Sequence, residues 1–147
     1  MELSDELHSK IVGLTRGGDD SLDAGRYADA LSSYHAAWKL LPEPKGVWEA
    51  ATFILVAIGD AHFFSRAYPE ALAAYRSALL CPDGLGNPYI HLRMGESHYE
   101  VGNIELAQDE LTRAYMGAGA EIFETEEEKY FDCLKSVLKP PIGSESL

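Results

Sequence analysis

The clearest hydrophobic pattern in the chain is a pair of helix-like stripes in residues 51–82. Leu55, Ile58 and His62 share one helical face in the first stripe, and apolar residues recur at helical spacing through the second. A short break at residues 66–68 separates the stripes, and it is followed by Pro69, a residue favoured in the first turn of a helix. The pattern predicts an antiparallel helical hairpin.

The same spacings recur before and after this hairpin, so the chain contains three copies of one unit. One equivalent position on the first helix of each copy is glycine: Gly18, Gly59 and Gly95. One position on the second helix is alanine: Ala30, Ala71 and Ala107. Side chains this small let the two helices of a hairpin approach closely. A single hairpin cannot bury its own apolar faces, whereas stacked copies can.

These residues resemble the tetratricopeptide repeat (TPR) family, which carries Leu-Gly and Tyr on the first helix and Ala, an aromatic residue and Ala on the second. The resemblance covers three repeats, at about residues 7–42, 47–82 and 88–117. It implies an all-α fold, an α-α superhelix wound as a right-handed solenoid of about seven helices. Gly18 and Gly59 lie further apart in sequence than Gly59 and Gly95, which we attribute to a long third helix over residues 47–65.

A seventh helix is predicted after the third repeat, at about residues 125–138. Thr125 and Glu128 have the spacing of a capping box, and Tyr130 begins an apolar stripe. A repeat array needs such a helix to cover its last apolar face. An acidic zone runs from Glu96 to Glu128 and is densest at Glu121, Glu124 and residues 126–128; it is expected to be a solvated helix start, with partner docking as the alternative. Residues 1–139 are therefore expected to form a single TPR-like domain and residues 140–147 a flexible tail.

The charge balance restricts the class of partner. The 147 residues include 12 basic and 24 acidic side chains, for a net charge of −12. Such a surface repels nucleic-acid phosphates and anionic membranes and favours cationic partners, although solubility alone also accounts for whole-chain acidity. Two cysteines are too few for a disulfide framework, and we find neither a secretion-signal pattern nor a membrane-length apolar run. We expect a cytoplasmic protein.

The resemblance also suggests which residues contact a partner, because in TPR proteins the first helix of each hairpin lines a concave groove. The corresponding positions combine aromatic rings with carboxylates, a surface suited to a basic, partly apolar segment. The alternative is that the rings around the third helix are buried, beneath that helix or the C-terminal helix. The predicted groove residues are Asp19, Phe53, Val56, Asp60, Phe63, Phe64, Tyr89, Leu92, Arg93, Glu96, Tyr99 and Glu100.

Three of these, Asp19, Asp60 and Glu96, occupy one equivalent position and predict a row of carboxylates. Some TPR proteins hold the terminal carboxylates of chaperones with basic groove residues. An acidic row would repel such a ligand.

Histidines supply the only candidate for metal chemistry. His62 and His98 replace the usual tyrosine of the repeat, and His91 replaces its tryptophan. Three imidazoles are a possible zinc site, but the repeat register places them in the packed interface between helices. The sequence has no phosphate-binding glycine loop and no nucleophile motif. We therefore expect no catalysis, no cofactor and no bound metal, and a histidine metalloenzyme is the outside alternative.

Two binding functions fit these observations. The first is a protein-interaction module that holds a basic peptide or protein surface in an acidic, aromatic groove. The second follows from a resemblance to short bacterial TPR-like proteins encoded beside secreted toxins, and it implies an immunity protein that occludes a basic toxin domain such as a nuclease. Both leave the oligomeric state open.

Overall fold

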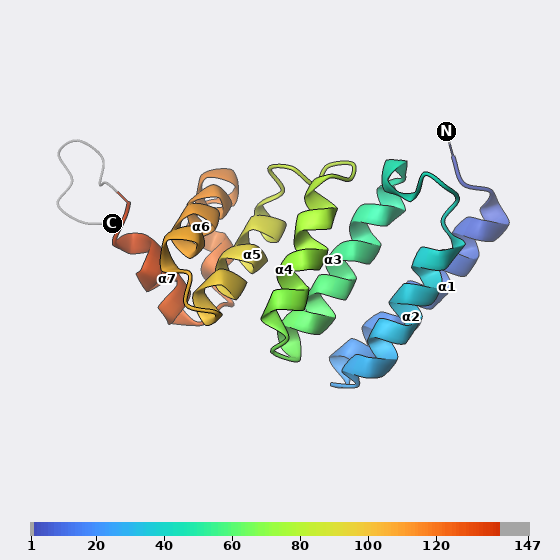
Figure 1. Cartoon of the computed structure of the whole chain (residues 1–147), viewed down its shortest axis with the longest axis horizontal. Helices are drawn as coiled ribbons and strands as arrows, with labels where there is room; N and C mark the ends of the chain where they lie inside the picture. Colours follow the sequence, from blue (N-terminus) through green and yellow to red (C-terminus); the bar gives the residue numbers. More distant parts are fainter. Residues whose placement is uncertain (1, 139–147) are drawn as a thin grey trace. The chain divides into compact units, whose positions relative to one another are not determined.

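The computed structural model describes residues 2–138, which form seven α-helices and two short 3-10 helices (Figure 1). The predicted all-α class and the three hairpins are confirmed. Within this described part no helix combines the length and apolar composition needed to cross a bilayer. The tail predicted at residues 140–147 lies outside the described residues. The elements are α1 (Asp5–Asp23), α2 (Tyr27–Leu40), η1 (Lys45–Val47), α3 (Glu49–Phe64), α4 (Tyr68–Leu79), α5 (Pro88–Glu100), α6 (Ile104–Ala118), η2 (Ala120–Phe123) and α7 (Glu128–Lys135).

The chain divides into two compact units, one up to Leu85 and one from Gly86 onward. Unit 1 holds the hairpins α1–α2 and α3–α4, and unit 2 holds the hairpin α5–α6 followed by η2 and α7. This division does not test whether residues 1–139 fold as a single domain, so that remains a prediction.

All three hairpins turn with the same backbone geometry. The turn begins with a residue of positive φ: Gly25 at 77°, Arg66 at 67° and Gly102 at 87°. In the second hairpin the Ala67 N–H then donates to the His62 carbonyl at 2.8 Å, and the other two hairpins repeat this bond. Such bonds satisfy carbonyls left unpaired at a helix end. Arg66 adopts without glycine a conformation that costs an ordinary residue roughly 1–2 kcal/mol.

Close approach at the repeated glycines is confirmed within each hairpin. A Cβ atom at Gly18 would lie 2.5 Å from the ring of Tyr34, and one at Gly59 would meet the ring of Tyr75 in the same way. At Gly95 the obstacle is Leu111, whose Cδ2 would lie 2.7 Å away. The three repeated alanines are fully buried. Larger side chains at these positions would force the paired helices apart.

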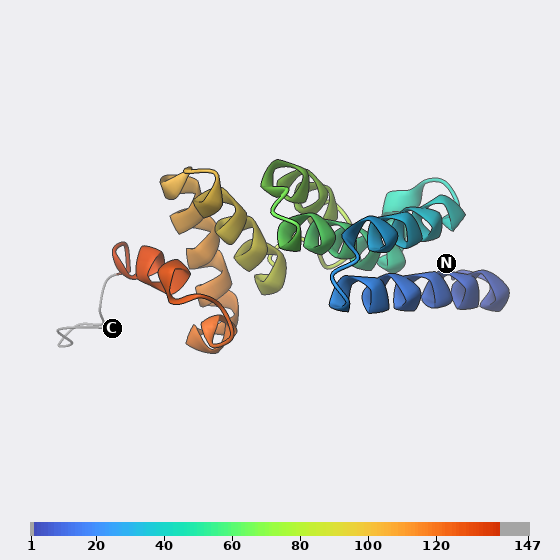
Figure 2. The same ribbon diagram turned by 90° about the horizontal axis from the view of Figure 1, so that it is seen from below.

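Each unit has a hydrophobic cluster of its own. In unit 1, Ile11, Tyr34 and Ile54 join residues of all four helices and their connections. In unit 2 the C-terminal segment completes the cluster, since Tyr130 and Leu134 of α7 are buried against Leu92 and Leu111. Helix α7 lies beside α6 in both views (Figures 1 and 2). The predicted seventh helix is therefore present, and it buries apolar surface of the third hairpin.

The start of the third helix differs from the prediction. Helix α3 begins at Glu49, because residues 45–47 form η1 and Trp48 is extended. Lys45 is drawn back to the end of α2, where its Nζ donates to the carbonyls of Trp38 at 3.1 Å and Leu41 at 2.6 Å. A long third helix alone does not account for the wider Gly18–Gly59 spacing. Part of it comes from α2, which has 14 residues, whereas the corresponding helix α4 has 12.

The predicted capping box of the seventh helix is not formed. The Thr125 hydroxyl donates to Glu126 Oε2 at 3.1 Å, and α7 begins after an extended Glu127 with no side-chain cap. The Glu126 side chain instead pairs with Arg93 of α5. The helix is consequently shorter than predicted.

Candidate interaction surface

The predicted groove residues of unit 1 are mostly accessible. Phe53 is 74% exposed and Phe64 45% exposed, both on α3. Asp19 on α1 is exposed, and Val56 and Asp60 on α3 are half-buried. The burial alternative holds for Phe63, which is 8% exposed. Its ring packs edge-on against Phe64 and Tyr68, at centroid distances of 5.2 and 5.6 Å.

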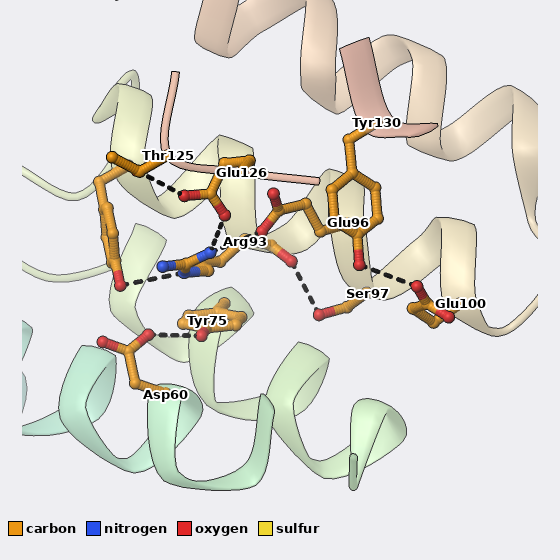
Figure 3. A network of polar contacts seen from close by, with 10 residues as sticks. Asp60, Tyr75, Arg93, Glu96, Ser97, Glu100, Thr125, Glu126 and Tyr130 are labelled. Carbon is orange, nitrogen blue, oxygen red and sulfur yellow. Dashed lines mark hydrogen bonds and ion pairs between the residues drawn. The ribbon is translucent and has the colours of Figure 1, made fainter. Parts of the chain in front are cut away.

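Two of the predicted carboxylates in unit 1 are oriented by tyrosines of their own hairpins. Tyr34 on α2 donates to Asp19 Oδ1, and Tyr75 on α4 donates to Asp60 Oδ1, each at 2.6 Å; Figure 3 shows the second pair. Each tyrosine ring lies against the repeated glycine of its hairpin, Gly18 or Gly59, where a Cβ atom would block it. Burial, followed by the bond to Asp19, raises the pKa of Tyr34, so this tyrosine stays neutral and a donor.

An additional feature of unit 1 is a hollow of about 810 Å³ between the first half of α1 and the start of α3. Its apolar lining includes the buried Ile11 and Ile54 and the more exposed Val47, Trp48 and Phe53. Among the described residues that line it, none is lysine or arginine. The acidic side chains that line it are Glu2, Asp5 and Glu49, all of them exposed.

Of the predicted groove residues, only Phe53 lines this hollow. The predicted third helix, over residues 47–65, includes Val47 and Trp48 in its first turn. In the structure Trp48 is extended and its Nε1 donates to the Pro42 carbonyl at 2.9 Å. The Trp48 ring is thereby held at the wall of the hollow. Pro42 and Pro44 restrict only the residues before them, Leu41 and Glu43, so no signal in the sequence predicted the extended conformation of Trp48.

In unit 2 the predicted groove residues are covered by the chain's own C-terminal segment. Leu92, Arg93 and Glu96 on α5 are 1%, 8% and 0% exposed. Arg93 Nη1 lies 2.7 Å from Glu96 Oε1 and 2.5 Å from Glu126 Oε1. Tyr89, half-buried, accepts a bond from Arg93 Nε at 3.0 Å. Figure 3 shows this cluster around the guanidinium. Glu96 therefore does not present the exposed carboxylate that the predicted row required.

The remaining two predicted residues of unit 2, Tyr99 and Glu100, contact α7. The ring of Tyr130 packs edge-on against Tyr99 at a centroid distance of 5.5 Å. Its hydroxyl donates to Glu100 Oε1 at 2.8 Å (Figure 3). Lys129 Nζ lies 2.6 Å from the same oxygen. Glu126, expected to be solvated, is also part of this internal contact. One sequence signal was available, because Leu111 stands where the other hairpins carry the tyrosine that holds the carboxylate.

Protonation in this cluster follows from burial. Burial, and then hydrogen bonding to Glu126, raises the pKa of Glu96 to about 9, against the opposing charge of Arg93. Burial alone would raise the pKa of Glu126 as well, but Glu96 and Arg93 together lower it. At neutral pH Glu96 is thus a neutral acid, and Arg93 and Glu126 form the ion pair.

The histidines have structural surroundings. His91 Nδ1 lies 2.5 Å from Glu110 Oε2, and its Nε2 accepts from the Gly86 N–H at 3.2 Å, which joins α5, α6 and the preceding loop. His98 is buried, and burial lowers the pKa of His62. Over residues 2–138, no three His, Cys, Asp or Glu side chains are grouped so that they could hold a metal ion.

Comparison with known proteins identifies the type of fold. No protein-family model matches the chain. No curated protein matches its sequence. Solved structures do match, among them the first TPR of Spaghetti (RPAP3) bound to the HSP90 peptide SRMEEVD, with a TM-score of 0.65, 15% identity and coverage of 87% of this chain and 92% of that one. PcrH from Pseudomonas aeruginosa matches with a TM-score of 0.69, 20% identity and coverage of 92% and 94%. The chain therefore has an all-α, TPR-like fold of sequential antiparallel helix pairs.

Proposed function

We propose that this protein is a non-catalytic interaction module, and that the α1–α3 face of unit 1 binds a basic, partly apolar segment of a partner protein. By the α1–α3 face we mean the surface that carries Asp19, Phe53, Val56, Asp60 and Phe64. One observation carries the proposal. This face keeps exposed rings beside carboxylates, whereas the equivalent residues of unit 2 are covered by the chain's own segment.

The exposed rings provide the apolar part of the argument. Aromatic side chains are enriched in the cores of protein interfaces, where their large area is removed from water. Phe53, at 74% exposure, leaves most of its ring in water in the isolated chain. Covering it is favourable for any partner that brings an apolar side chain.

The charges on the α1–α3 face determine which charge the partner segment should carry. Asp19 and Asp60 lie on this face, and the whole chain carries −12. A cationic segment is therefore attracted during approach and complemented on docking. The first TPR of Spaghetti shares the fold and was solved with a peptide, which supports peptide binding here. That peptide is acidic, with two adjacent glutamates and a terminal aspartate. The α1–α3 face carries carboxylates that would repel such a peptide, so we propose a ligand of opposite charge for this face.

Capture from the native cell tests the proposal. The wild-type chain, a Phe53→Ser/Phe64→Ser variant and a Met116→Ser control are immobilised, and bound proteins are identified by mass spectrometry. Met116 is a matched control because it is 76% exposed and lies on α6 in unit 2. We expect the wild type and the control to enrich the same partner and the double variant to lose it. Equal capture by all three folded proteins, or capture by none, contradicts the proposal.

The immunity function remains a second candidate, because an acidic face with exposed rings fits a folded basic domain as well as a peptide. Co-expression with the product of a toxin-like neighbouring gene distinguishes the two. Rescue of growth by the wild type, and its loss in the double variant, supports immunity. Absence of such a gene together with capture of a partner unrelated to toxins removes this candidate and keeps the interaction module.

A further inference from the structure

We infer that the hollow of unit 1 is the anchor site for the partner. In this site a large apolar side chain enters between Trp48 and Phe53, and neighbouring lysine or arginine side chains meet Glu2, Asp5 and Glu49. The inference rests on the proposed function and adds to it the place and the local sequence chemistry of the ligand: an aromatic or long aliphatic residue flanked by cations.

The size and lining of the hollow fit such an anchor. Its volume of about 810 Å³ lies within the range of about 300–1,000 Å³ that is typical of ligand sites. Ile11 and Ile54 at its base are 3% and 0% exposed, whereas Phe53 and Val47 on its wall are 74% and 47% exposed. The wall therefore offers apolar surface that only an incoming side chain would cover.

The wall is also fixed in advance of binding. The Trp48 indole is tied to the Pro42 carbonyl at 2.9 Å. Lys45 Nζ binds the Leu41 carbonyl at 2.6 Å, which holds the connection that precedes Trp48. On the other side, the Thr52 hydroxyl donates to the Pro82 carbonyl at 2.7 Å. A site whose walls are already ordered loses less conformational entropy on binding.

The charges around the hollow select a cation over an anion. Helices α1 and α3 both begin beside it, and each helix N-terminus acts as roughly half a positive charge. Against these stand three carboxylates, from Glu2, Asp5 and Glu49, and His8 is the one basic side chain among the described residues that line the hollow. The Ser4 side chain also already accepts the Leu7 N–H at 3.2 Å, so the start of α1 is capped from within. The balance is negative, which favours lysine or arginine and disfavours an acidic peptide.

A defined peptide tests this inference without the native partner. The probe is a short tryptophan-free peptide in which lysines flank one phenylalanine and one leucine. Two matched peptides replace the lysines by glutamates, or both apolar residues by serine. The chain has two tryptophans, so a Trp38→Phe background leaves Trp48 as the fluorescence reporter. We expect the lysine peptide to change Trp48 fluorescence saturably and both matched peptides to bind at least about tenfold more weakly, the loss typical of removing one hot-spot contact.

Variants then locate the peptide. Glu49→Lys and Phe53→Ser are each expected to weaken the lysine peptide by about tenfold or more. Glu105→Lys and Met116→Ser are the controls and should bind as the wild type does. Glu105 matches Glu49 because both are exposed acids in the first turn of a helix. Far-UV circular dichroism and thermal unfolding confirm that each variant is folded.

Several outcomes overturn the inference. Equal binding of the glutamate peptide shows that the acids do not select the ligand, and wild-type affinity in Glu49→Lys places the peptide elsewhere. If light scattering shows a dimer that Phe53→Ser dissociates, and the peptide does not bind, a second copy occupies the hollow instead. Loss of native-partner capture in Phe53→Ser/Phe64→Ser, together with unchanged capture by Glu49→Lys, leaves the proposed function standing and rejects the anchor site alone. Failure of the wild type to capture any partner rejects the proposed function itself.

Discussion

One helix position carries a carboxylate in all three hairpins, yet its surroundings differ between the two units. In unit 1, Asp19 and Asp60 are held by Tyr34 and Tyr75 of their own hairpins. In unit 2 the equivalent tyrosine is replaced by Leu111, and Glu96 is buried with Arg93 and Glu126. The difference teaches that this carboxylate is paired inside its own hairpin where the second helix carries tyrosine, and is buried with Arg93 and Glu126 where the second helix carries leucine.

The largest expected effect comes from removing the cation in unit 2. Arg93→Ala leaves the Glu126 carboxylate without its counter-charge beside the buried neutral acid Glu96, and breaking a buried pair in this way costs about 3–5 kcal/mol. The measurement is the urea midpoint of unfolding. Arg93→Met combined with Glu96→Leu and Glu126→Gln is the control, since it removes the ion pair and the neutral acid together. A loss below about 1 kcal/mol in Arg93→Ala, the level of a surface pair, would show that the cluster does not hold α7 to α5.

An effect of intermediate size is expected in the pH dependence of the stability, and it arises from Glu96 in unit 2. The pKa of Glu96 is raised from 4.5 to about 9 in the folded state, so folding binds a proton that the unfolded chain releases. The stability that this proton contributes is full below pH 4.5 and is lost as the pH rises through about 9. The lowered pKa of Glu126 acts in the opposite sense and matters only in acid.

Glu96→Gln should therefore flatten the pH dependence in alkaline solution. Between about pH 7 and pH 9 the wild type is expected to lose roughly 2 kcal/mol through this group, and the variant should lose much less. Urea unfolding at both pH values makes the comparison, with Asp60→Asn as a control in unit 1. Parallel losses in wild type and Glu96→Gln would refute the assignment of Glu96 as a neutral acid.

A smaller effect is expected from the tyrosines of unit 1. Tyr75→Phe removes the hydroxyl that donates to Asp60 and should cost about 1.5 kcal/mol, the lower end of the range for a hydrogen bond to a charged group, because Asp60 is only half-buried. Tyr34→Phe should behave similarly because the bond to Asp19 has the same 2.6 Å length. Thermal unfolding reports both. Unchanged stability in both variants would mean that these bonds orient the carboxylates without stabilising the fold.

The smallest effect concerns the turn of the middle hairpin. Arg66 has a φ of 67°, where the other two hairpins carry glycine. Arg66→Gly relieves the steric cost of this conformation but raises the entropy of the unfolded chain, so a net gain of about 0.5 kcal/mol is expected. Gly25→Arg and Gly102→Arg should show the reverse sign. Destabilisation by Arg66→Gly would instead reveal a side-chain role for Arg66.

Local patterns sufficed to predict the hairpins. The positions of Gly59 and Ala71 within a 3.6-residue period specify which sides of two helices meet, and the structure confirms that approach. Ser4 caps the start of α1 with its side chain. Gly119 follows the end of α6 with a positive φ of 76°, a conformation that glycine adopts readily. Such features depend on neighbours a few residues away and are readable from the sequence.

Contacts between distant segments were not readable in this way. Glu126 reaches Arg93 across 33 residues of sequence, and Thr52 reaches Pro82 across 30. Neither residue type predicts such a partner, so the acidic run looked like a solvated helix start. Nor does the residue type of Lys45 predict that its amine binds the carbonyls at the end of α2. Trp48, which lines the hollow, follows this connection, and of the predicted groove residues only Phe53 lines the hollow.

Backbone amide NMR titration with the lysine peptide tests the central claim most directly, because it reports on the faces of both units in the same sample. We predict chemical-shift changes centred on Glu49, Phe53 and Val56 of α3 and on the facing part of α1, with residues 92–100 of α5 unchanged. Changes centred on Leu92, Glu96 and Tyr99, accompanied by changes in α7, would contradict the account. They would show that the partner displaces the C-terminal segment from unit 2 instead of binding the open face of unit 1.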